Sequence, residues 1–559
     1  MPLWFNFMGY SKFILIVSSL CGYLSLNTIF LSSGVFALEM IEDEEISGEL
    51  NQENLLLSQS ENNQIVAQSV RVEGNSIFER EIGEILNLYD TQEFTNEDLA
   101  QISADITQLY LNGAYLTTRA FVEDIDRDGV AIIRVIEGEI QAIEIEGVER
   151  LEGYVLDRIA LGTGKPFNSD RLEDQLKLLN SDPLIDNIEG SLRSGDAVGQ
   201  SILSVRVTEA NPFSGSIAIN NYSPPRVGDV QGDINLRHGN VLGFGDAFSV
   251  SFRPRFEQFL STYDLTFGYS APLNPMNGTL DTTVSLQRNR IVSGPFQVLD
   301  ISGSSEFYEV SYRQPLIRNP LTEFALSLGM SYRTGQTFTF QGPTPFGIGP
   351  DENGISRTNV LTFGQDYIKR EQFGAWAVRS QFRLGMGLFN VTTSEAPNNP
   401  DGYFFAWNGQ VQRIQLLGRD HFLIIQGDIQ LTGDALLPSE QFSIGGGQSL
   451  RGYRQNARSG DNGFRFSVED RITISRNEAQ ESVLQLVPFF DMGAVWNVSS
   501  NPNFLPSQNF LAALGMGLIW QPKQNLYFRL DYAPPLINLG DRTDNIQDDG
   551  LYFNMRYNF

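Results

Sequence analysis

The stretch "LYFNMRYNF" (Leu551–Phe559) alternates residue by residue between two kinds of side chain. Five large apolar side chains fall on one face of the extended chain: Leu551, Phe553, Met555, Tyr557 and Phe559. Four polar or amphipathic side chains fall on the other: Tyr552, Asn554, Arg556 and Asn558. This alternation is what a strand needs when one face meets lipid and the other meets an aqueous lumen.

The same period of two fills the chain from Phe213 to Phe559, where turn residues separate the alternating stretches. It predicts sixteen strands, near 214–222, 229–239, 245–256, 260–271, 278–291, 304–316, 322–338, 356–370, 374–387, 402–417, 421–434, 462–475, 482–496, 508–521, 525–534 and 549–559. An even number of strands of roughly ten residues favours a closed antiparallel transmembrane barrel spanning 211–559. A soluble antiparallel sheet packed on a core is the alternative, because it alternates as well.

The connections between these strands differ in length according to whether they follow an even- or an odd-numbered strand. Those after even-numbered strands are short, and most of those after odd-numbered strands are long, the longest being 435–461. Short turns on one rim and long loops on the other are typical of outer-membrane barrels. The parity of the loops therefore favours a barrel over a soluble sandwich.

Residues 1–37 have the features of a secretory signal peptide. Lys12 precedes an apolar stretch, Phe13–Phe36, and Val35-Phe36-Ala37 is an acceptable cleavage site. An uncleaved membrane anchor is the alternative. After this segment no run of about 18 apolar residues occurs, so helical membrane spans are not expected.

The only cysteine, Cys21, lies within this segment. Leu20 precedes it where a lipoprotein signal would place a small residue, which argues against lipidation. A chain cleaved after residue 37 would have no cysteine, and hence no disulfide and no thiolate metal site.

Two copies of a β-α-α-β-β module are predicted, over 68–139 and 140–210. "VRVEG" (Val70–Gly74) in the first copy matches "IEIEG" (Ile143–Gly147) in the second. In the first copy Thr95 and Asp98 form a capping box pattern, and Gly113 is suited to end the helix that follows. The acidic segment before the modules, 38–67, is interpreted as a flexible linker, with a marginal helix as the alternative.

Two short motifs stand at particular places in the barrel. "LRGY" (Leu450–Tyr453) lies in the longest loop, and "FFDMG" (Phe489–Gly493) lies in the thirteenth strand. The alternation in that strand turns Phe489, Asp491 and Gly493 toward the lumen. An inward-facing aspartate favours a guanidinium partner, because a charge-assisted hydrogen bond to arginine is strong and directional.

With these motifs the chain resembles the hemolysin secretion/activation proteins (TpsB, ShlB/FhaC/HecB type) of two-partner secretion, whose modules are called POTRA domains. The resemblance covers essentially the whole chain after the signal segment. It suggests that the segment 38–67 can form a helix that plugs the pore, as the alternative to a linker. It implies that the loop 435–461 re-enters the barrel and that Arg451 contacts Asp491. Gly452 would allow a tight turn at the tip, Gly493 would leave room for it, and Tyr453 would pack on the inner wall.

The resemblance further implies an outer-membrane protein with its modules in the periplasm of a Gram-negative-type cell. Its partner would be an adhesin- or hemolysin-like exoprotein that binds the modules, crosses the barrel and folds outside. The chain is expected to be a monomer surrounded by outer-membrane lipid and inserted by the outer-membrane assembly machinery. An outer-membrane protein assembly factor is the alternative function, although such factors usually carry more than two modules. A diffusive porin is a further alternative, but it would lack the modules.

Composition and motifs exclude other classes of partner and activity. The net charge of −28 argues against nucleic acid. The sequence "GGGQSLRG" lacks the spacing of a nucleotide-binding loop. The two histidines, His238 and His421, are too few for a three-histidine metal site and have no serine–aspartate pair nearby in the sequence. No catalytic residue, metal or cofactor is therefore expected.

Overall fold

The computed structural model describes residues 39–40, 67–89, 93–259, 261–294, 296–396 and 399–559. The chain divides between Ala210 and Asn211 into two compact units. The predicted signal segment and nearly all of the segment 38–67 lie outside the described residues, and with them the choice between linker and plug. Among the helices in the described ranges, none is long and apolar enough to cross a membrane.

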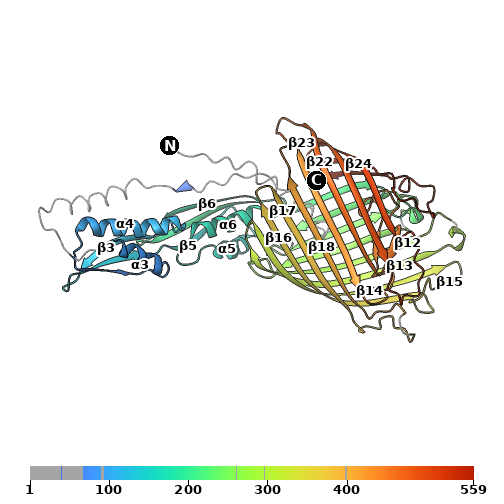
Figure 1. Ribbon diagram of the computed structural model, residues 1–559, viewed down its shortest axis with the longest axis horizontal. Coiled ribbons are helices and arrows are strands. Elements are labelled where there is room, and N and C mark those ends of the chain that lie inside the picture. Colours follow the sequence, from blue (N-terminus) through green and yellow to red (C-terminus); the bar gives the residue numbers. More distant parts are fainter. Residues whose placement is uncertain (1–38, 41–66, 90–92, 260, 295, 397–398) are drawn as a thin grey trace. The chain divides into compact units, whose positions relative to one another are not determined.

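The N-terminal unit contains the two modules (Figure 1). The elements of the first are β2 (Ser69–Glu73), α3 (Glu79–Asn87), α4 (Asn96–Asn112), β3 (Arg119–Ile125) and β4 (Val130–Ile136). Those of the second are β5 (Glu139–Glu146), α5 (Glu152–Ala160), α6 (Ser169–Asn180), β6 (Ile185–Ser194) and β7 (Gln200–Glu209). The order β-α-α-β-β is the same in both. A short strand, β1 (Glu39–Met40), pairs in parallel with β6.

Both modules use the same sheet topology. The sheet orders are β2-β4-β3 and β1-β6-β7-β5, so the last strand of each module runs between its first and fourth elements. The first strand pairs with it in parallel and the preceding strand in antiparallel fashion. Because the crossover passes through two helices, each sheet has one face covered by helices, and the buried side chains of that face form a separate core in each module.

The repeated glycines of "VRVEG" and "IEIEG" have a common structural reason. Gly74 and Gly147 follow the first strand of their modules with φ of 92° and 85°, values that favour glycine. A β-carbon at Gly74 would lie closer than 3.0 Å to the carbonyl oxygen of Val135, and one at Gly147 would meet that of Val207 in the same way. Just after the first strand, the chain therefore passes close to the backbone of the last strand, at the same place in each module.

Local capping fixes the start of α4 as the sequence predicts. The Thr95 side chain accepts a hydrogen bond from the Asp98 backbone at 3.2 Å, and Asp98 accepts one from the Thr95 backbone at 2.9 Å. Gly113 follows the helix as its C-cap. The predicted capping box is confirmed, and caps of this kind stabilise a helix by about 1 kcal/mol.

The two modules are joined by hydrogen bonds between the end of α4 and the start of α6. The Asn168 side chain caps α6 by accepting from the Arg171 backbone at 3.1 Å, and its Nδ2 donates to the carbonyl of Gly113 at 2.9 Å. The backbone N–H of Ser169 donates to the carbonyl of Ala114 at 2.9 Å. Carbonyl groups left over at one helix end are thus satisfied by the first residues of a helix in the next module.

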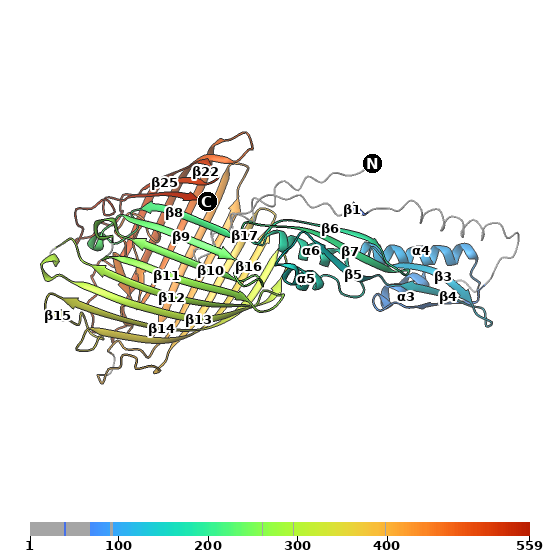
Figure 2. The same ribbon diagram turned by 180° about the vertical axis from the view of Figure 1, so that it is seen from behind.

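The C-terminal unit is a closed antiparallel barrel, in which the described residues form sixteen long strands and a two-residue extension, β15 (Gly342–Pro343) (Figure 2). The long strands are β8 (Phe213–Asn220), β9 (Gln231–Gly239), β10 (Ala247–Pro254), β11 (Tyr263–Pro272), β12 (Thr279–Arg290), β13 (Ser302–Arg318), β14 (Thr322–Thr339), β16 (Ile355–Glu371), β17 (Gly374–Gly385), β18 (Phe405–Leu416), β19 (His421–Thr432), β22 (Asn462–Arg476), β23 (Ser482–Trp496), β24 (Phe510–Lys523), β25 (Leu526–Tyr532) and β26 (Leu551–Asn558). The predicted sixteen-stranded barrel is confirmed.

The two rims of the barrel differ in loop length. On one rim the connections run from the two residues 372–373 to the seven residues 240–246. On the other they run from the eight residues 255–262 to the 29 residues 433–461. The ring closes where β26 pairs with β8, with Met555 opposite Ile219 and Tyr557 opposite Ile217.

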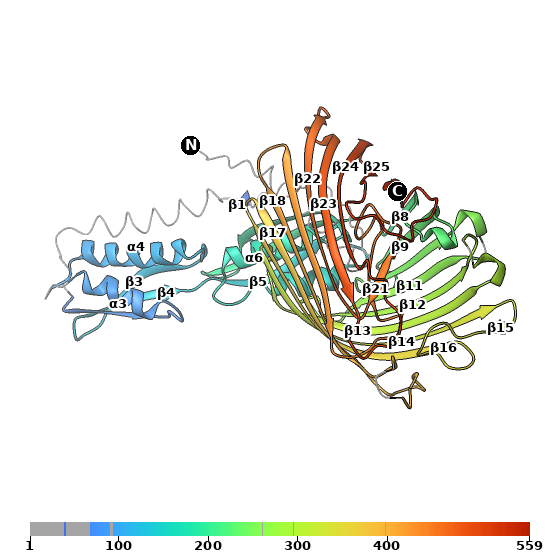
Figure 3. The same cartoon turned by 45° about the vertical axis from the view of Figure 1, so that its right-hand side comes forward.

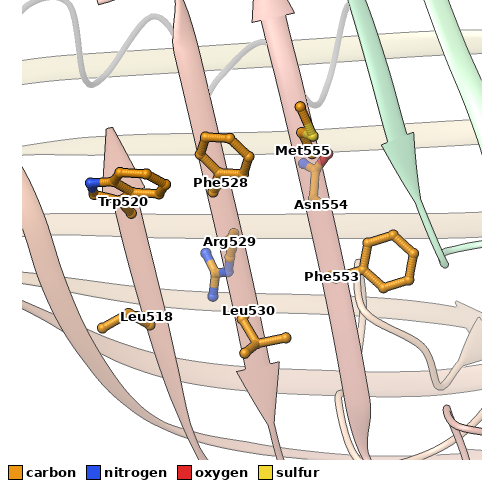
Figure 4. A pocket seen from close by; sticks show the side chains of 8 residues that line it. All are labelled: Leu518, Trp520, Phe528, Arg529, Leu530, Phe553, Asn554 and Met555. Atoms are coloured by element: carbon orange, nitrogen blue, oxygen red, sulfur yellow. The ribbon is translucent and has the colours of Figure 1, made fainter. Parts of the chain in front are cut away.

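The outward face of the barrel is apolar, as its alternation predicts. Figure 4 shows a groove on β24, β25 and β26 lined mainly by large apolar side chains: Leu518, Trp520, Phe528, Leu530, Phe553 and Met555. Residues of opposite parity, such as Asp531 and Tyr552, are buried. Lipid-facing and lumen-facing side chains therefore alternate along the strands.

We expect Gly74→Ala or Gly147→Ala to destabilise its module by more than about 1 kcal/mol, because alanine disfavours positive φ and its β-carbon would meet a backbone oxygen. Gly83→Ala in α3 and Gly153→Ala in α5 are matched controls with open space around the new methyl group. Limited proteolysis of the full protein, followed by fragment mapping within 68–210, measures local opening. Equal resistance in all four variants would contradict the packing described.

Candidate functional site

The longest connection of the barrel, residues 433–461 between β19 and β22, folds back inside the ring and is called here the re-entrant loop. It contains a small hairpin of β20 (Phe442–Ile444) and β21 (Arg458–Gly460), which lies within the ring of strands in the view of Figure 3. Gly445 and Gly446 follow β20 with φ of 111° and 104° and turn the chain into the tip. Most side chains of the tip are buried, which is unusual for a connecting loop.

Arg451, at the tip, binds Asp491 on β23 in a two-pronged contact. Its Nε lies 2.7 Å from Oδ2 of Asp491 and its Nη2 lies 2.8 Å from Oδ1. The backbone N–H of Arg451 also donates to Oδ2, at 3.1 Å. The side chains are 7% and 1% exposed, so solvent screens this ion pair little.

A second carboxylate and an aromatic ring complete the surroundings of Arg451. Its Nη1 donates to Oε2 of Glu469 on β22 at 2.8 Å, and its guanidinium lies over the ring of Phe489, 3.3 Å from the centroid. Glu469 in turn accepts from Nη2 of Arg529 on β25 at 2.7 Å and from Nε of Arg471 at 2.8 Å. Phe489 and Asp491 thus hold one guanidinium from two directions.

The charges in this cluster balance. Three arginines, Arg451, Arg471 and Arg529, interact with three carboxylates, Glu469, Asp491 and Asp531. Burial of a charge is costly unless each group is paired and hydrogen-bonded, and removal of one partner from such a pair typically costs about 3–5 kcal/mol. The tip of the re-entrant loop is therefore held by a network in which removal of one member leaves a buried charge with fewer partners.

Gly452 fits a place that no other residue could occupy without strain. Its φ is 95°, and a β-carbon would come within 3.0 Å of Ala513 on β24 and of the carbonyl oxygen of Ala533. Its backbone N–H donates to the hydroxyl of Tyr552 at 2.9 Å. The prediction that glycine is needed for a tight turn agrees with this geometry.

Gly493 lies close to the neighbouring strand. A side chain at Gly493 would first meet the carbonyl oxygen of Phe464 and the backbone of Arg465 on β22. The inward face alone does not give these neighbours, because a residue's neighbour on the adjacent strand depends on the pairing register. Beside Gly452 stands the small side chain of Ala513, and the role of Gly493 in leaving room for the tip stays a prediction.

Leu450 and Tyr453 pack into an apolar cluster between the loop and the wall, in which both are nearly inaccessible. The Tyr453 hydroxyl donates to the carbonyl of Ala512 on β24 at 2.8 Å. It also accepts from the backbone N–H groups of Ala512 and Ile537, at 3.2 and 3.3 Å. The pairing of β24 with β25 ends at Met516 and Tyr532. Tyr453 thereby supplies hydrogen bonds to β24 beyond the end of that pairing.

The last strand contributes to the site through its inward face. Tyr552 is fully buried and donates its hydroxyl to the carbonyl of Tyr453 at 2.7 Å. On the opposite face, Met555, Tyr557 and Phe559 are between 45% and 47% exposed. The backbone of Phe559 exchanges two hydrogen bonds of 2.9 Å with Gly215.

Sequence reasoning missed a second set of contacts at the base of the tip. Arg454 and Arg458 both bind Asp541, in the connection between β25 and β26, at 2.6 and 2.8 Å. Arg454 also contacts the buried Asp548 at 3.3 Å. The sequence does contain Arg454 and Arg458 in one loop and an acid-rich stretch, 541–549, in another, but both segments lie in connections without a period.

Asp541 shows the electrostatic effect of this second set. Hydrogen bonds from Arg458, with further attraction from Arg454, lower the pKa of the Asp541 carboxyl to about 2. A carboxyl whose pKa is lowered on folding stabilises the folded form at pH values above its ordinary pKa, and this contribution is lost as pH falls toward 2. Asp541 is therefore ionised at neutral pH, and its ion pairs with Arg454 and Arg458 are fully charged.

Two family models match the chain. One, described as the haemolysin secretion/activation protein ShlB/FhaC/HecB, covers residues 199–519, and one for the POTRA domain of ShlB type covers residues 65–138. The heme/hemopexin transporter protein HuxB of Haemophilus influenzae is 23% identical over 487 residues, which are 84% of this chain and 82% of that protein.

Solved structures share the fold. CdiB from Escherichia coli is similar with a TM-score of 0.72 at 20% identity, covering 94% of this chain and 100% of that one. BamA from Haemophilus ducreyi, lacking POTRA domains 1–3, gives a TM-score of 0.53 at 14% identity, covering 89% of this chain and 100% of that one.

We expect Asp491→Asn to release the tip of the re-entrant loop. The change leaves a buried guanidinium with Glu469 as its remaining carboxylate, at a cost of about 3 kcal/mol, so local opening should increase roughly 100-fold. Trypsin cleavage after Arg451, Arg454 or Arg458, mapped by mass spectrometry in the folded protein, reports this opening. Asp420→Asn, which breaks an exposed ion pair with Arg476 on the short-turn rim, is the control and should leave these sites protected. Equal protection in the Asp491 variant would refute the anchoring role.

Proposed function

The chain belongs to the haemolysin secretion/activation protein family ShlB/FhaC/HecB, and on that premise we propose how its two units share the work of secretion. The protein is an outer-membrane transporter of two-partner secretion that moves a partner exoprotein across the outer membrane. Its barrel spans the outer membrane and its N-terminal modules lie in the periplasm. The resemblance drawn from the two motifs is confirmed.

The re-entrant loop acts as a movable closure of the lumen, anchored by Arg451 on Asp491. The observation that carries this proposal is the balanced charge cluster around Arg451, buried on the inner wall and formed with the tip of a loop rather than between strands alone. A connection that served only to join β19 and β22 would need no such site. A loop held by discrete ion pairs has two states, held and released, which is what a gate requires.

The modules bind the exoprotein through a sheet edge. In the first module β3 is an edge strand, and it presents two neighbouring apolar side chains, Phe121 and Val122, that are 41% and 37% exposed. An unfolded polypeptide can add to such an edge as a further strand, using main-chain hydrogen bonds for affinity and pockets for side chains. The exposed apolar pair on β3 supports this edge as the one that meets the exoprotein.

The exoprotein is of the adhesin or hemolysin type. The transporter works as a monomer, a proposal supported by the closure of its ring of strands within one chain. The alternating face of Leu551–Phe559 serves as the signal for the outer-membrane assembly machinery. Family members are transporters, and the chain is proposed to carry out no catalysis.

Deletion of this protein should strand one exoprotein in the periplasm, because the barrel is the route for a dedicated partner. Fractionation of the periplasm and the medium, with protein identification by mass spectrometry, measures the outcome, and a plasmid copy should restore secretion. A general loss of outer-membrane proteins would instead support the assembly-factor alternative and count against this function.

We expect Phe121→Ser to weaken binding of the exoprotein's N-terminal region by roughly tenfold, since loss of a half-exposed phenylalanine removes about 1.4 kcal/mol of apolar contact. Titration of the purified transporter with an N-terminal fragment of the exoprotein measures the affinity. Leu88→Ser is the matched control, because Leu88 is 80% exposed beyond the end of α3 and off the sheet edge. Equal weakening by both variants, or by neither, would exclude the β3 edge.

A further inference from the structure

Glu440, in the part of the re-entrant loop that precedes the hairpin, is buried against a different arc of the barrel wall. Its Oε1 accepts from the hydroxyl of Thr358 on β16 at 2.8 Å. Its Oε2 accepts from Nη2 of Arg383 on β17, and Nε of Arg333 on β14 lies 3.9 Å from Oε1. The Glu440 side chain is only 3% exposed. A carboxylate of the loop is thus paired with guanidinium groups of the wall.

Apolar contacts accompany this ion pair. Leu436 of the loop is fully buried in a cluster with Val360 on β16 and with Phe404. The backbone carbonyl of Glu440 accepts from Nε2 of Gln430 on β19 at 3.0 Å. The first part of the loop is therefore seated on the wall by packing and by a backbone hydrogen bond as well as by charge.

Two of the anchors of the loop, Arg451 and Glu440, differ in the sign of their charge and in their place on the wall. At the tip an arginine of the loop binds carboxylates of β22 and β23, whereas at Glu440 a carboxylate of the loop binds arginines of β14 and β17. In the ring order these groups of strands are separated by β18 and β19. A loop fastened on two arcs cannot leave the lumen by pivoting while both anchors hold.

The Glu440 anchor is the more accessible to water. The side chains of Arg383 and Arg333 are 20% and 32% exposed, compared with 7% for Arg451. Water can thus replace the partners of Arg383 and Arg333 at lower cost than those of Arg451.

We propose that Glu440 is the releasable anchor of the re-entrant loop. Its departure clears the arc of the wall formed by β14, β16 and β17 while Arg451 keeps the tip in place. The vacated guanidinium groups of Arg383 and Arg333 then face the exported polypeptide and bind its carboxylate side chains in passing. This inference rests on the proposed role of the loop in closing the lumen.

The test is the conductance of the purified full-length protein in planar lipid bilayers, without exoprotein. Glu440→Gln removes the charge but keeps the size of the side chain, so the ratio of conducting to closed time should rise about tenfold, as expected for the loss of a charge-assisted hydrogen bond. The exchanged pair Glu440→Arg with Arg383→Glu should return the ratio to within about twofold of the unmodified protein, because opposite charges face each other again. Heat-dependent migration on gels confirms that each barrel is folded.

Glu371→Gln is the matched control, since Glu371 lies at the other end of β16 and pairs with Arg413 at 3.0 Å without touching the loop. It should conduct like the unmodified protein. If Arg451→Ala raises conductance and Glu440→Gln does not, this inference is overturned while the proposed function stands. If neither raises it, the closure role of the loop fails as well. If the exchanged pair stays open, the pairing with Arg383 is wrong.

Discussion

The charge pair of Arg451 and Asp491, buried inside the barrel, is the interaction on which the rest of the site depends. A guanidinium cannot lose its proton in a protein, so a loop that brings one into the lumen must find carboxylates there. Asp491 supplies two oxygen atoms and Glu469 a third, and Glu469 then requires Arg471 and Arg529 to offset its own charge. One residue in a loop therefore determines charged positions on three strands. The same demand fixes Phe489, because a ring under the guanidinium shields it from water without competing for its hydrogen bonds.

The barrel could be predicted from sequence because its signal is local. A period of two and a turn identify a strand without knowledge of its neighbours, and the alternation turned Phe489 and Asp491 inward correctly. The alternating pattern does not determine the register, that is, which residue of one strand stands opposite which residue of the next. Many inward positions carry charge, and whether Glu469 or another carboxylate meets Arg451 depends on β22 pairing with β23 so that Glu469 stands opposite Phe489. The neighbours of Gly493 on β22 depend on the register in the same way. Glu440 lies in an irregular segment, where neither period nor face exists to point to its partners.

The two modules could also be predicted from the sequence, because their signals are either repeated or local. Gly74 and Gly147 recur because the backbone passes close to a carbonyl group at the same position in each module. This steric requirement calls for glycine in both modules, although most of their other residues differ. The Thr95–Asp98 capping box is likewise contained within four residues. The contacts that join the modules were not anticipated, since Asn168 and Gly113 are 55 residues apart and each looks like an ordinary helix terminus in the sequence.

That junction between α4 and α6 has a mechanical consequence. Asn168 and Ser169 satisfy carbonyl groups at the end of one helix while they begin another, so the two modules cannot turn against each other without exposing unpaired backbone groups at both helix ends. Under the proposal that the first module holds a segment of the exoprotein, tension in that segment would pass to the second module through these hydrogen bonds.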